Sequence, residues 1–386
     1  MAKHARRGTP NPLLRQAREE LGLTQDELAD QLIQLGAKGV TGGSVSKWER
    51  GVCRPNSFHR RLLCGFFDAT PEQLGFHRGR RNGGLDTEAE EAIRAVLLEP
   101  ARATVKLSWL VWYGNADTSV VHRVASLTAT LADLADRYQG ALRSSILELM
   151  AYGHEMIGKV AFDQLDYPTA YRHFLDMQRL GEELADARII GLSAIHQGDL
   201  LRRRGQYDLA VQRLESTASH TADVAPTIEG LRQQTLARAH AEQGHREDFV
   251  RTIEAAQASA AELQGSEEDW GNEFSAIAVL HERAHGHTLL WEPEKALDIY
   301  EGSESRLQIA ALRDLGSFTI LKAQAHAYAG NVDVGVELAI EGLRFARRYD
   351  SPRHVSRVER MYDRLSATPI GSSARMRDLA EALRVA

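Results

Sequence analysis

Apolar side chains recur every three or four residues over most of the chain, which is the spacing of helices that bury one face. Near the N-terminus, Leu28 and Leu32 are preceded by Thr24 and Glu27. A hydroxyl and a carboxylate at this spacing form a capping box, in which two side chains accept hydrogen bonds from N–H groups that the start of a helix leaves unsatisfied. The pattern therefore predicts a short helix that begins after Thr24.

A second short helix is predicted after Thr41, whose side chain can cap it. Val45 and Trp48 form its inward face, and Gly51 is placed to end it. Three further helices flank these two. They run from Pro12 to Leu21 with Leu13, Leu14, Ala17 and Leu21 inward, from Ser57 to Phe67, and onward from Thr70, where Pro71 takes the first helical position.

These five helices, between residues 11 and 76, resemble the helix-turn-helix (HTH) domain of the XRE family, the phage-repressor and Cro type. The resemblance implies that the second and third helices contact DNA. Gln25 and Ser46 are then expected to bind phosphates, and Ser44 and Lys47 to face base edges. The other positions that the resemblance assigns to DNA are Thr41, Gly42, Gly43, Arg50 and Arg54.

Two features depart from the family pattern. Residues 33–39 lengthen the turn between the second and third helices. Gly42 and Gly43 stand where relatives carry side chains that touch bases, although glycine weakens a helix by about 1 kcal/mol relative to alanine. Either the start of the third helix orders only on DNA, or its N–H groups approach a phosphate closely. Arg6 and Arg7 in the N-terminal arm are expected to add minor-groove contacts.

The charge distribution favours a nucleic-acid partner at one end of the chain. The 386 residues carry a net charge of −6. Residues 1–81 hold 14 Lys and Arg against 8 Asp and Glu, a net charge of +6, so the remainder is acidic. Cys53 and Cys64 lack metal-ligand spacing, and no apolar run in the sequence is long enough to span a membrane. We therefore expect a cytoplasmic protein without a cofactor.

From about residue 141 onward the chain is repetitive. Gly158 and Ala170 lie 12 residues apart, and Gly198 and Ala210 repeat this pair 40 residues later. Further small residues continue the series at steps of about 39 to 47 residues, namely Ala237, Gly244, Ala284, Ala296, Ala323, Gly330 and Gly335. Each unit resembles a tetratricopeptide repeat (TPR), a pair of helices whose small residues allow close approach. Stacked units are expected to form a superhelix with a concave groove.

The resemblance to TPRs also implies which side chains face the groove. The expected ligand-binding positions are Tyr152, Lys159, Arg202, Arg203, Gln234, Arg238, His281, His285 and Gln324. Arginine, amide and aromatic side chains suit a peptide or another small ligand. Among them, Arg202, Arg203 and Arg238 are expected to anchor an acidic or carboxylate-bearing group. The alternative is a groove that only meets water.

A different function is suggested by residues 281–285, whose sequence HERAH fits the HExxH pattern of zinc peptidases. On a helix, the two histidines of this pattern share one face for zinc and the glutamate acts as general base. Arg283 brings a positive charge into the motif, which disfavours zinc, and the candidates for a third ligand are His287, Glu301 and Glu304. Because the motif lies within the fourth repeat, we expect no metal and no catalytic residue.

The sequence thus predicts an all-α chain with a five-helix HTH domain and a TPR-like superhelix. The predicted parts are a basic arm (1–10), the HTH domain (11–76), a glycine-rich linker (77–86), a helical connector (87–140), the repeats (141–366) and a C-terminal helix (367–386). Trp109 and Trp112 in the connector are expected in a buried core or in a subunit contact.

This combination resembles the peptide-responsive RRNPP regulators of Gram-positive bacteria and the XRE–repeat regulators of actinobacteria, which are tied to secondary metabolism. The resemblance implies a transcriptional regulator, not an enzyme, that binds double-stranded DNA as a homodimer at a pseudo-palindromic operator. Its repeats are expected to sense a signalling peptide or a small molecule, without a membrane partner. The alternatives are an HTH-fused zinc metallopeptidase and a TPR scaffold for partner proteins with a vestigial HTH.

Overall fold

The computed structural model describes residues 10–37, 39–67, 69–71, 73–76, 92–115, 117–221, 224–263, 274–303 and 312–384. All regular secondary structure in these ranges is helical, which confirms the predicted all-α class. The chain divides into two compact units, residues 1–84, here called the head, and residues 85–386, here called the body. Arg6 and Arg7 and the predicted linker up to residue 86 lie outside the described residues.

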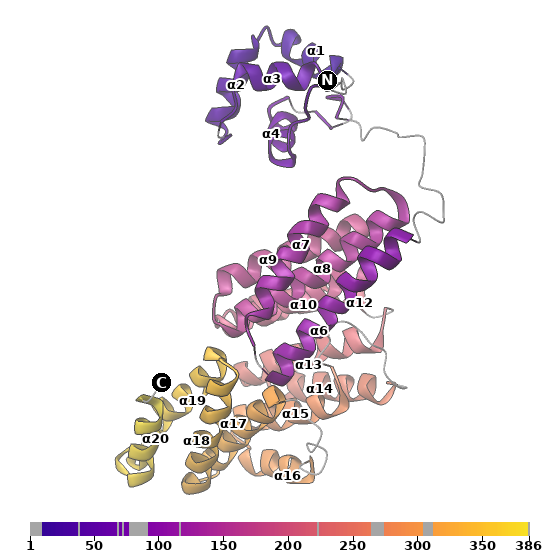
Figure 1. The fold of residues 1–386 in the computed structure, drawn as a ribbon. Coiled ribbons are helices and arrows are strands. Elements are labelled where there is room, and N and C mark those ends of the chain that lie inside the picture. The colour runs from indigo at the N-terminus through magenta and orange to yellow at the C-terminus, as the bar shows by residue number, and fades with distance from the viewer. Residues whose placement is uncertain are drawn as a thin grey trace. The chain divides into compact units, whose positions relative to one another are not determined.

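The head contains the helices α1 (Pro12–Glu20), α2 (Gln25–Gln34), α3 (Gly42–Glu49) and α4 (Ser57–Phe67) (Figure 1). The predicted capping box of α2 is present, because the Glu27 N–H donates to Thr24 Oγ1 (3.2 Å) and the Thr24 N–H donates to Glu27 Oε2 (2.7 Å). Thr41 and Ser44 form a second capping box at the start of α3. Both helices therefore begin where their side chains satisfy the first free N–H groups.

The core of the head is formed by one face of each helix. Its fully buried side chains include Leu14, Leu28, Leu32, Val45 and Leu63. The prediction for α1 was wrong in part, since Leu13 and Leu21 are exposed and only Leu14 of its leucines enters the core. Because Leu14 faces the core, its neighbour Leu13 points away from the other three helices.

Where the fifth helix of the head was predicted, the described residues 71 and 73–75 form a turn. Thr70 and Gln73 begin it as a capping pair, with the Thr70 N–H donating to Gln73 Oε1 at 2.8 Å. It stops at Gly75, whose φ of +69° is a left-handed conformation that does not continue a helix. A side chain at Gly75 would also collide with the Asn11 amide at the start of α1.

The body is a succession of packed helices (Figure 1). A π-helical turn η1 (Arg94–Leu98) leads into α6 (Glu99–Asn115), which is followed by α7 (Val120–Ala135), α8 (Gly140–Asp163), α9 (Tyr167–Leu184), α10 (Ala187–Arg203), α11 (Tyr207–Ser216), α12 (Ala218–Thr221), α13 (Pro226–Gln243) and α14 (Arg246–Ala261). The later elements are α15 (Ala276–Leu289), α16 (Pro293–Ser303), α17 (Leu312–Tyr328), α18 (Val332–Arg348), α19 (Pro352–Ser366), a 3₁₀ turn η3 (Pro369–Ser372) and α20 (Ala374–Arg384).

The TPR-like repeats are the pairs α8/α9, α10/α11, α13/α14, α15/α16 and α17/α18. A residue with a left-handed backbone lies between the two helices of every pair, and these residues follow one another at steps of 40, 39, 47 and 39: Leu165, Gly205, Gly244, Trp291 and Gly330. The small residues that defined the repeat in the sequence are buried where the helices touch. A Cβ on Gly158 would approach the Phe174 ring to 2.5 Å, and one on Gly198 would approach Leu214 to 2.7 Å.

Residues 92–135, which were predicted as a connector, pack directly on the first repeat. Trp109 and Trp112 of α6 share one apolar core with α7 and α8, and Trp112 is only 1% exposed. These tryptophans therefore belong to the core of the body and are not available for a subunit contact. At the other end, α20 packs on α18 and α19, so the C-terminal helix extends the same helical array.

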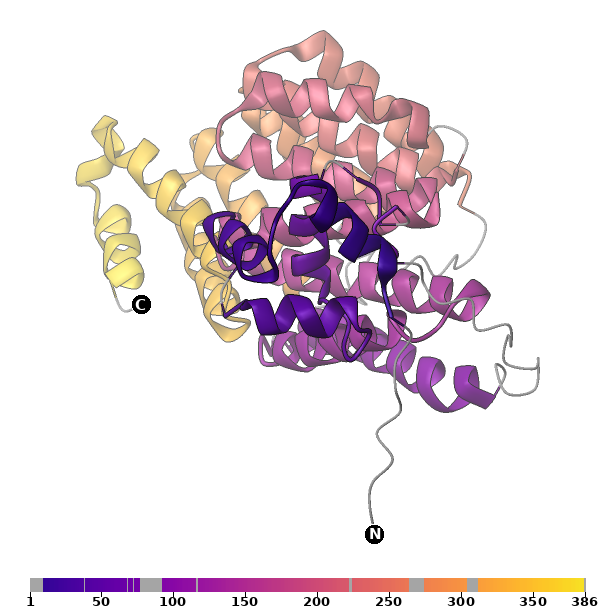
Figure 2. The ribbon, with the colours of Figure 1, turned by 90° about the horizontal axis from the view of Figure 1, so that it is seen from above.

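The body curves so that helices near its start contact helices near its end, while α20 stands to one side of these contacts (Figure 2). Contacts join α6 to α17 and α8 to α19. At the meeting point, Asp163 at the end of α8 accepts hydrogen bonds from Arg313 of α17 (2.5 Å) and from Arg353 of α19 (2.8 Å). The Gln164 side chain also donates to the Asp350 carbonyl at 2.6 Å. These contacts bridge the open side of the superhelix, and the concave surface becomes the wall of a pocket.

Candidate functional site

The outer surface of α3 is the candidate DNA-binding surface of the head. Because Val45 and Trp48 are buried in the core, the opposite side of this helix faces away from the head. Of the positions predicted to contact DNA, Thr41, Gly43, Lys47, Arg50 and Arg54 are exposed, and Gln25, Ser44 and Ser46 are half-buried. Three of the exposed positions carry a positive charge, which suits contact with phosphates.

Gly42 differs from the other positions assigned to DNA, because it is buried. A Cβ on this residue would overlap the Asp26 carboxylate and lie 3.0 Å from the Asp26 backbone nitrogen. Gly42 thus allows the first turn of α3 to touch the first turn of α2. Gly43 has no such constraint, since the nearest atom to its Cβ position would be Thr41 Oγ1 at 3.5 Å.

A buried ion pair, which the sequence patterns did not predict, joins three helices of the head. Arg18 Nε of α1 donates to Glu49 Oε1 of α3 at 2.6 Å, and Arg18 Nη2 donates to Glu49 Oε2 at 3.2 Å. Gln25 of α2 donates to the same Glu49 Oε2 at 2.7 Å. The Gln25 amide is therefore oriented by Glu49, at the edge of the surface where it was predicted to meet a phosphate.

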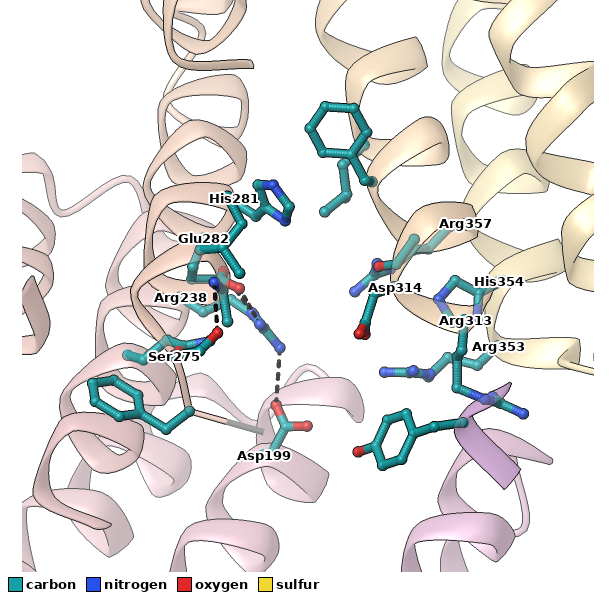
Figure 3. A pocket seen from close by; sticks show the side chains of 18 of the residues that line it. Asp199, Arg238, Ser275, His281, Glu282, Arg313, Asp314, Arg353, His354 and Arg357 are labelled. Atoms are coloured by element: carbon teal, nitrogen blue, oxygen red, sulfur yellow. Dashed lines mark hydrogen bonds and ion pairs between the residues drawn. The ribbon is translucent and has the colours of Figure 1, made fainter. Parts of the chain in front are cut away.

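The body contains a pocket of about 510 Å³ on its concave side (Figure 3). Its walls come from α6, α8, α10, α13, α15, α17 and α19 and from the segment before α15. The charged residues among its lining are Lys159, Asp199, Arg238, Glu282, Arg313, Asp314, Arg353 and Arg357. With five cationic and three anionic side chains, the lining carries an excess of positive charge.

On one wall, Arg238 is already neutralised by carboxylates (Figure 3). It forms a bidentate pair with Glu282 and lies 3.7 Å from Asp199. Burial alone would raise the pKa of Glu282, but the adjacent Arg238 outweighs it and lowers this pKa to about 2. Arg202 lies behind this wall and is only 2% exposed, where it bonds to Asp199 at 2.8 Å and to Glu242 at 2.6 Å. Neither arginine is therefore available as the ligand anchor that was predicted.

The opposite wall is built by α17 and α19. Arg313 is paired with Asp163, and its guanidinium lies 4.3 Å from the ring centroid of Trp112. Arg353 shares Asp163 with it. Arg357, by contrast, makes one hydrogen bond with a described residue, from Nη1 to Ser317 Oγ at 3.3 Å. Arg357 was not among the predicted groove positions, because α19 lies at the end of the predicted repeats, beyond the first helices that carry those positions.

The predicted groove residues divide into two groups. Lys159, Gln234, Arg238 and His281 line the pocket, whereas Tyr152, Arg202, Arg203, His285 and Gln324 lie outside its lining. Tyr152 and His285 are buried between helices. Gln324 donates to the Tyr328 hydroxyl at 3.1 Å. The structure therefore brings together four of the nine positions.

The HExxH residues do not form a zinc site with any third ligand in the described part of the chain. Glu282 is engaged by Arg238, which leaves it unsuited to act as a general base. The His281 ring lies against Phe318, with ring centroids 4.7 Å apart, and burial lowers its pKa to about 4. Glu304 lies outside the described residues. The group of described side chains that has metal-ligand spacing is elsewhere, at His240, His245 and Asp248.

No protein-family model matches this chain, and no curated protein sequence matches it. Two solved structures resemble its fold. The TPR-like repeats of a Podospora anserina protein of the kinesin light chain type are 17% identical, with 53% of this chain and 97% of that chain covered and a TM-score of 0.36. Bacillus thuringiensis PlcR, in complex with the peptide PapR7 and DNA, is 12% identical, with 96% of both chains covered and a TM-score of 0.32.

Identities this low concern the arrangement of helices alone and do not extend to the side chains of either site. In the described part of the chain, no helix is long and apolar enough to cross a membrane.

Proposed function

We propose that this protein is a sequence-specific DNA-binding regulator whose body holds a ligand-binding pocket. The head reads DNA with α3, and the body responds to a peptide or another small molecule. The proposal is supported by the two-unit organisation of the chain, by the polar outer surface of α3 and by the charged pocket of the body. The proposed regulator has no catalytic step.

The observation that carries the proposal is the division of α3 into two faces. Val45 and Trp48 hold the helix in the core, and the Arg18–Glu49 pair fixes its C-terminal end. Lys47 is then presented outward from a rigid element, as base recognition requires. Arg50 and Arg54 beyond it supply contacts to phosphates, which fix register without reading sequence.

The test is selection of DNA sites from a random pool with the full-length protein, followed by binding measurements on the best site. Replacing Lys47 with alanine should cost about 1–3 kcal/mol on that site and relax the preference at one base pair. Binding to random DNA should change much less. Lys295→Ala, which removes an exposed lysine from the body, is the matched control and should bind as the parent does.

Two outcomes contradict the proposal at different levels. Equal losses for Lys47→Ala on selected and random DNA would leave this side chain with phosphate contacts alone. A selection that enriches no sequence would remove DNA reading altogether and favour the alternative of a protein scaffold with a vestigial HTH. The salt dependence of the affinity gives the number of phosphate contacts in either case.

We also propose that the regulator acts as a homodimer on a pseudo-palindromic site. One short reading helix gives weak specificity, and a two-fold dimer doubles the number of base contacts. Since Trp109 and Trp112 are internal, the supporting surface is the exposed apolar side of η1 and α6. Val96, Leu107 and Leu110 there are 79%, 59% and 70% exposed. Light scattering of the protein, free and on its selected DNA, measures the subunit number.

A further inference from the structure

Two arginines beside the pocket lack a carboxylate partner among the described residues. Arg357 of α19 lines the pocket and makes a single long hydrogen bond, to a serine hydroxyl. Arg203, at the end of α10, has Nε and Nη2 buried without any hydrogen-bond partner among the described residues. A guanidinium carries five N–H donors and a permanent charge, and removing it from water without compensation is costly.

The neighbouring carboxylates are paired with other guanidiniums, and none of them forms an ion pair with Arg203 or Arg357 in the described part of the chain. These engaged pairs are Arg313–Asp163, Arg353–Asp163, Arg202–Asp199, Arg202–Glu242 and Arg238–Glu282. Asp314 also lines the pocket, but no hydrogen bond or ion pair joins it to Arg357. Burial raises the pKa of the Asp314 carboxyl, which favours its neutral form and lessens its repulsion of an anion.

The unbalanced charge is concentrated in one region. Loss of water lowers the pKa of Arg357, and the positive charges of Arg353 and Arg238 lower it further. For Arg203, burial lowers the pKa most, and the nearby charge of Arg357 is the next largest cause. Arg203 lies outside the lining, but its charge adds to that of Arg357, and a negative charge bound at Arg357 in the pocket relieves their repulsion.

Part of the remaining lining is apolar, beside polar residues such as Gln234, Ser275 and Ser317. Phe274 comes from the segment before α15 and Ile277 from its first turn, and Phe318 and Leu321 come from α17. A volume of about 510 Å³ is within the range of sites for small molecules and is bounded by helices, unlike an open groove for a long extended peptide. The pocket therefore offers an anchor for a negative charge beside a surface for a hydrocarbon or aromatic group.

We infer that the pocket binds a small amphipathic anion, whose carboxylate or phosphate is held by Arg357 next to Arg203 and whose apolar part contacts Phe274 and Phe318. This inference deepens the proposed function, on which its regulatory meaning rests, by naming the chemical class of the ligand. It also moves the anchor from Arg202 and Arg238, which carboxylates neutralise, to Arg357, with the charge of Arg203 nearby.

The first experiment uses the full-length protein and 8-anilinonaphthalene-1-sulfonate (ANS), a fluorescent probe with an aromatic body and one negative charge. We expect one saturable site per chain. Arg357→Met should weaken binding roughly 10- to 100-fold, as expected for losing a hydrogen-bonded charge, while Arg357→Lys should keep part of the affinity. Arg360→Ala, an exposed arginine one turn along α19, is the matched control and should not change binding.

A second readout separates binding from folding. Since Arg357 has no carboxylate partner, its replacement by methionine should leave the melting temperature unchanged or raise it. A purely structural arginine would instead lower the melting temperature when replaced. Arg357→Met with unchanged ANS affinity, or ANS binding that Arg360→Ala weakens equally, would overturn the inference.

Competition against bound ANS identifies the ligand chemistry. Decanoate and decyl phosphate carry a carboxylate and a phosphate on the same hydrocarbon chain, and decanol lacks the charge. Displacement by either anion at concentrations at least tenfold below those needed for decanol is expected, and the better anion indicates the natural head group. Equal displacement by decanol would show an apolar site without anion recognition and would contradict the inference.

The outcome is independent of DNA binding. If ANS binds as expected but no DNA sequence is selected, the pocket assignment stands and the proposed regulatory function fails. If DNA is read but ANS and both anions fail to bind, the proposed function stands and the ligand class is wrong.

Discussion

Replacing Glu49 tests how the buried Arg18–Glu49 pair holds α3 in the head. Both side chains are almost fully buried, at 9% and 3% exposure. Glu49→Ala removes the acceptor of two hydrogen bonds from Arg18 and of one from Gln25. Arg18 then keeps the Leu23 carbonyl at 2.6 Å and lies 3.5 Å from the half-exposed Glu19 carboxylate, so its buried charge loses its buried counter-ion.

Breaking a buried ion pair from one side costs about 3–5 kcal/mol. Small domains are stable by only about 0.05–0.15 kcal/mol per residue, so this cost is comparable to the whole stability of the head. Glu49→Ala should therefore unfold a large part of the head and abolish DNA binding. The double variant Arg18→Met with Glu49→Leu removes both charges and should be much less destabilising than the sum of its parts.

Hydrogen exchange on the full-length chain measures this directly, because it reports the head and the body separately. Amides in the centres of α1 and α3 should lose protection by about 100-fold or more in Glu49→Ala, as a cost above 3 kcal/mol requires. Amides in α8 to α18 should not change, since they belong to the other unit. The control is Glu20→Ala, an exposed glutamate of α1, for which less than about 0.5 kcal/mol is expected. Protection in Glu49→Ala within threefold of the parent would refute the reasoning.

Two further predictions concern the first turn of α3 and the charge of the pocket. Gly43→Ala should stabilise the head by up to about 1 kcal/mol through helix propensity, whereas Gly42→Ala should lose this gain or destabilise the head, because its Cβ meets Asp26. Thermal unfolding of the two variants measures this difference, and equal shifts in melting temperature would contradict the prediction. ANS affinity should fall as the pH rises above about 8. Burial and the charge of Arg353 lower the pKa of Lys159 to about 8, and a bound anion favours the protonated form of this lysine. An ANS affinity that stays constant up to about pH 9.5 would contradict a role of Lys159 in binding the anion.

Features that depend on residues close together in the sequence could be predicted from the sequence. Thr24 and Glu27 are three residues apart, and the capping bonds between them follow from that spacing alone. The repeat was predicted in the same way, since the small residues Gly158 and Ala170 recur 40 residues later as Gly198 and Ala210. Such patterns determine the helices, their starts and their pairing with the next helix.

Long-range contacts left no comparable signal. Asp163 and Arg313 are 150 residues apart, and their pairing depends on how much each repeat turns relative to the last, an angle that accumulates over the whole body. The same accumulated curvature decides that the groove becomes a pocket and that Arg357 faces it. Gly42 was ambiguous for a related reason, because its close contact with Asp26 belongs to the packing of two helices and not to the sequence of either.

The closed form of the body limits how a ligand can act. A ligand changes DNA affinity only if it favours one arrangement of the protein over another. The pocket is lined by Tyr113 of α6 and Lys159 of α8 at the start of the body and by Arg353 and Arg357 of α19 near its end. An anion between these elements draws together positive side chains from both ends, beside the place where Asp163 already joins them. In the proposed regulator, α6 is the first long helix of the body, so a shift of α6 against α17 is the movement by which a bound anion would act on DNA binding.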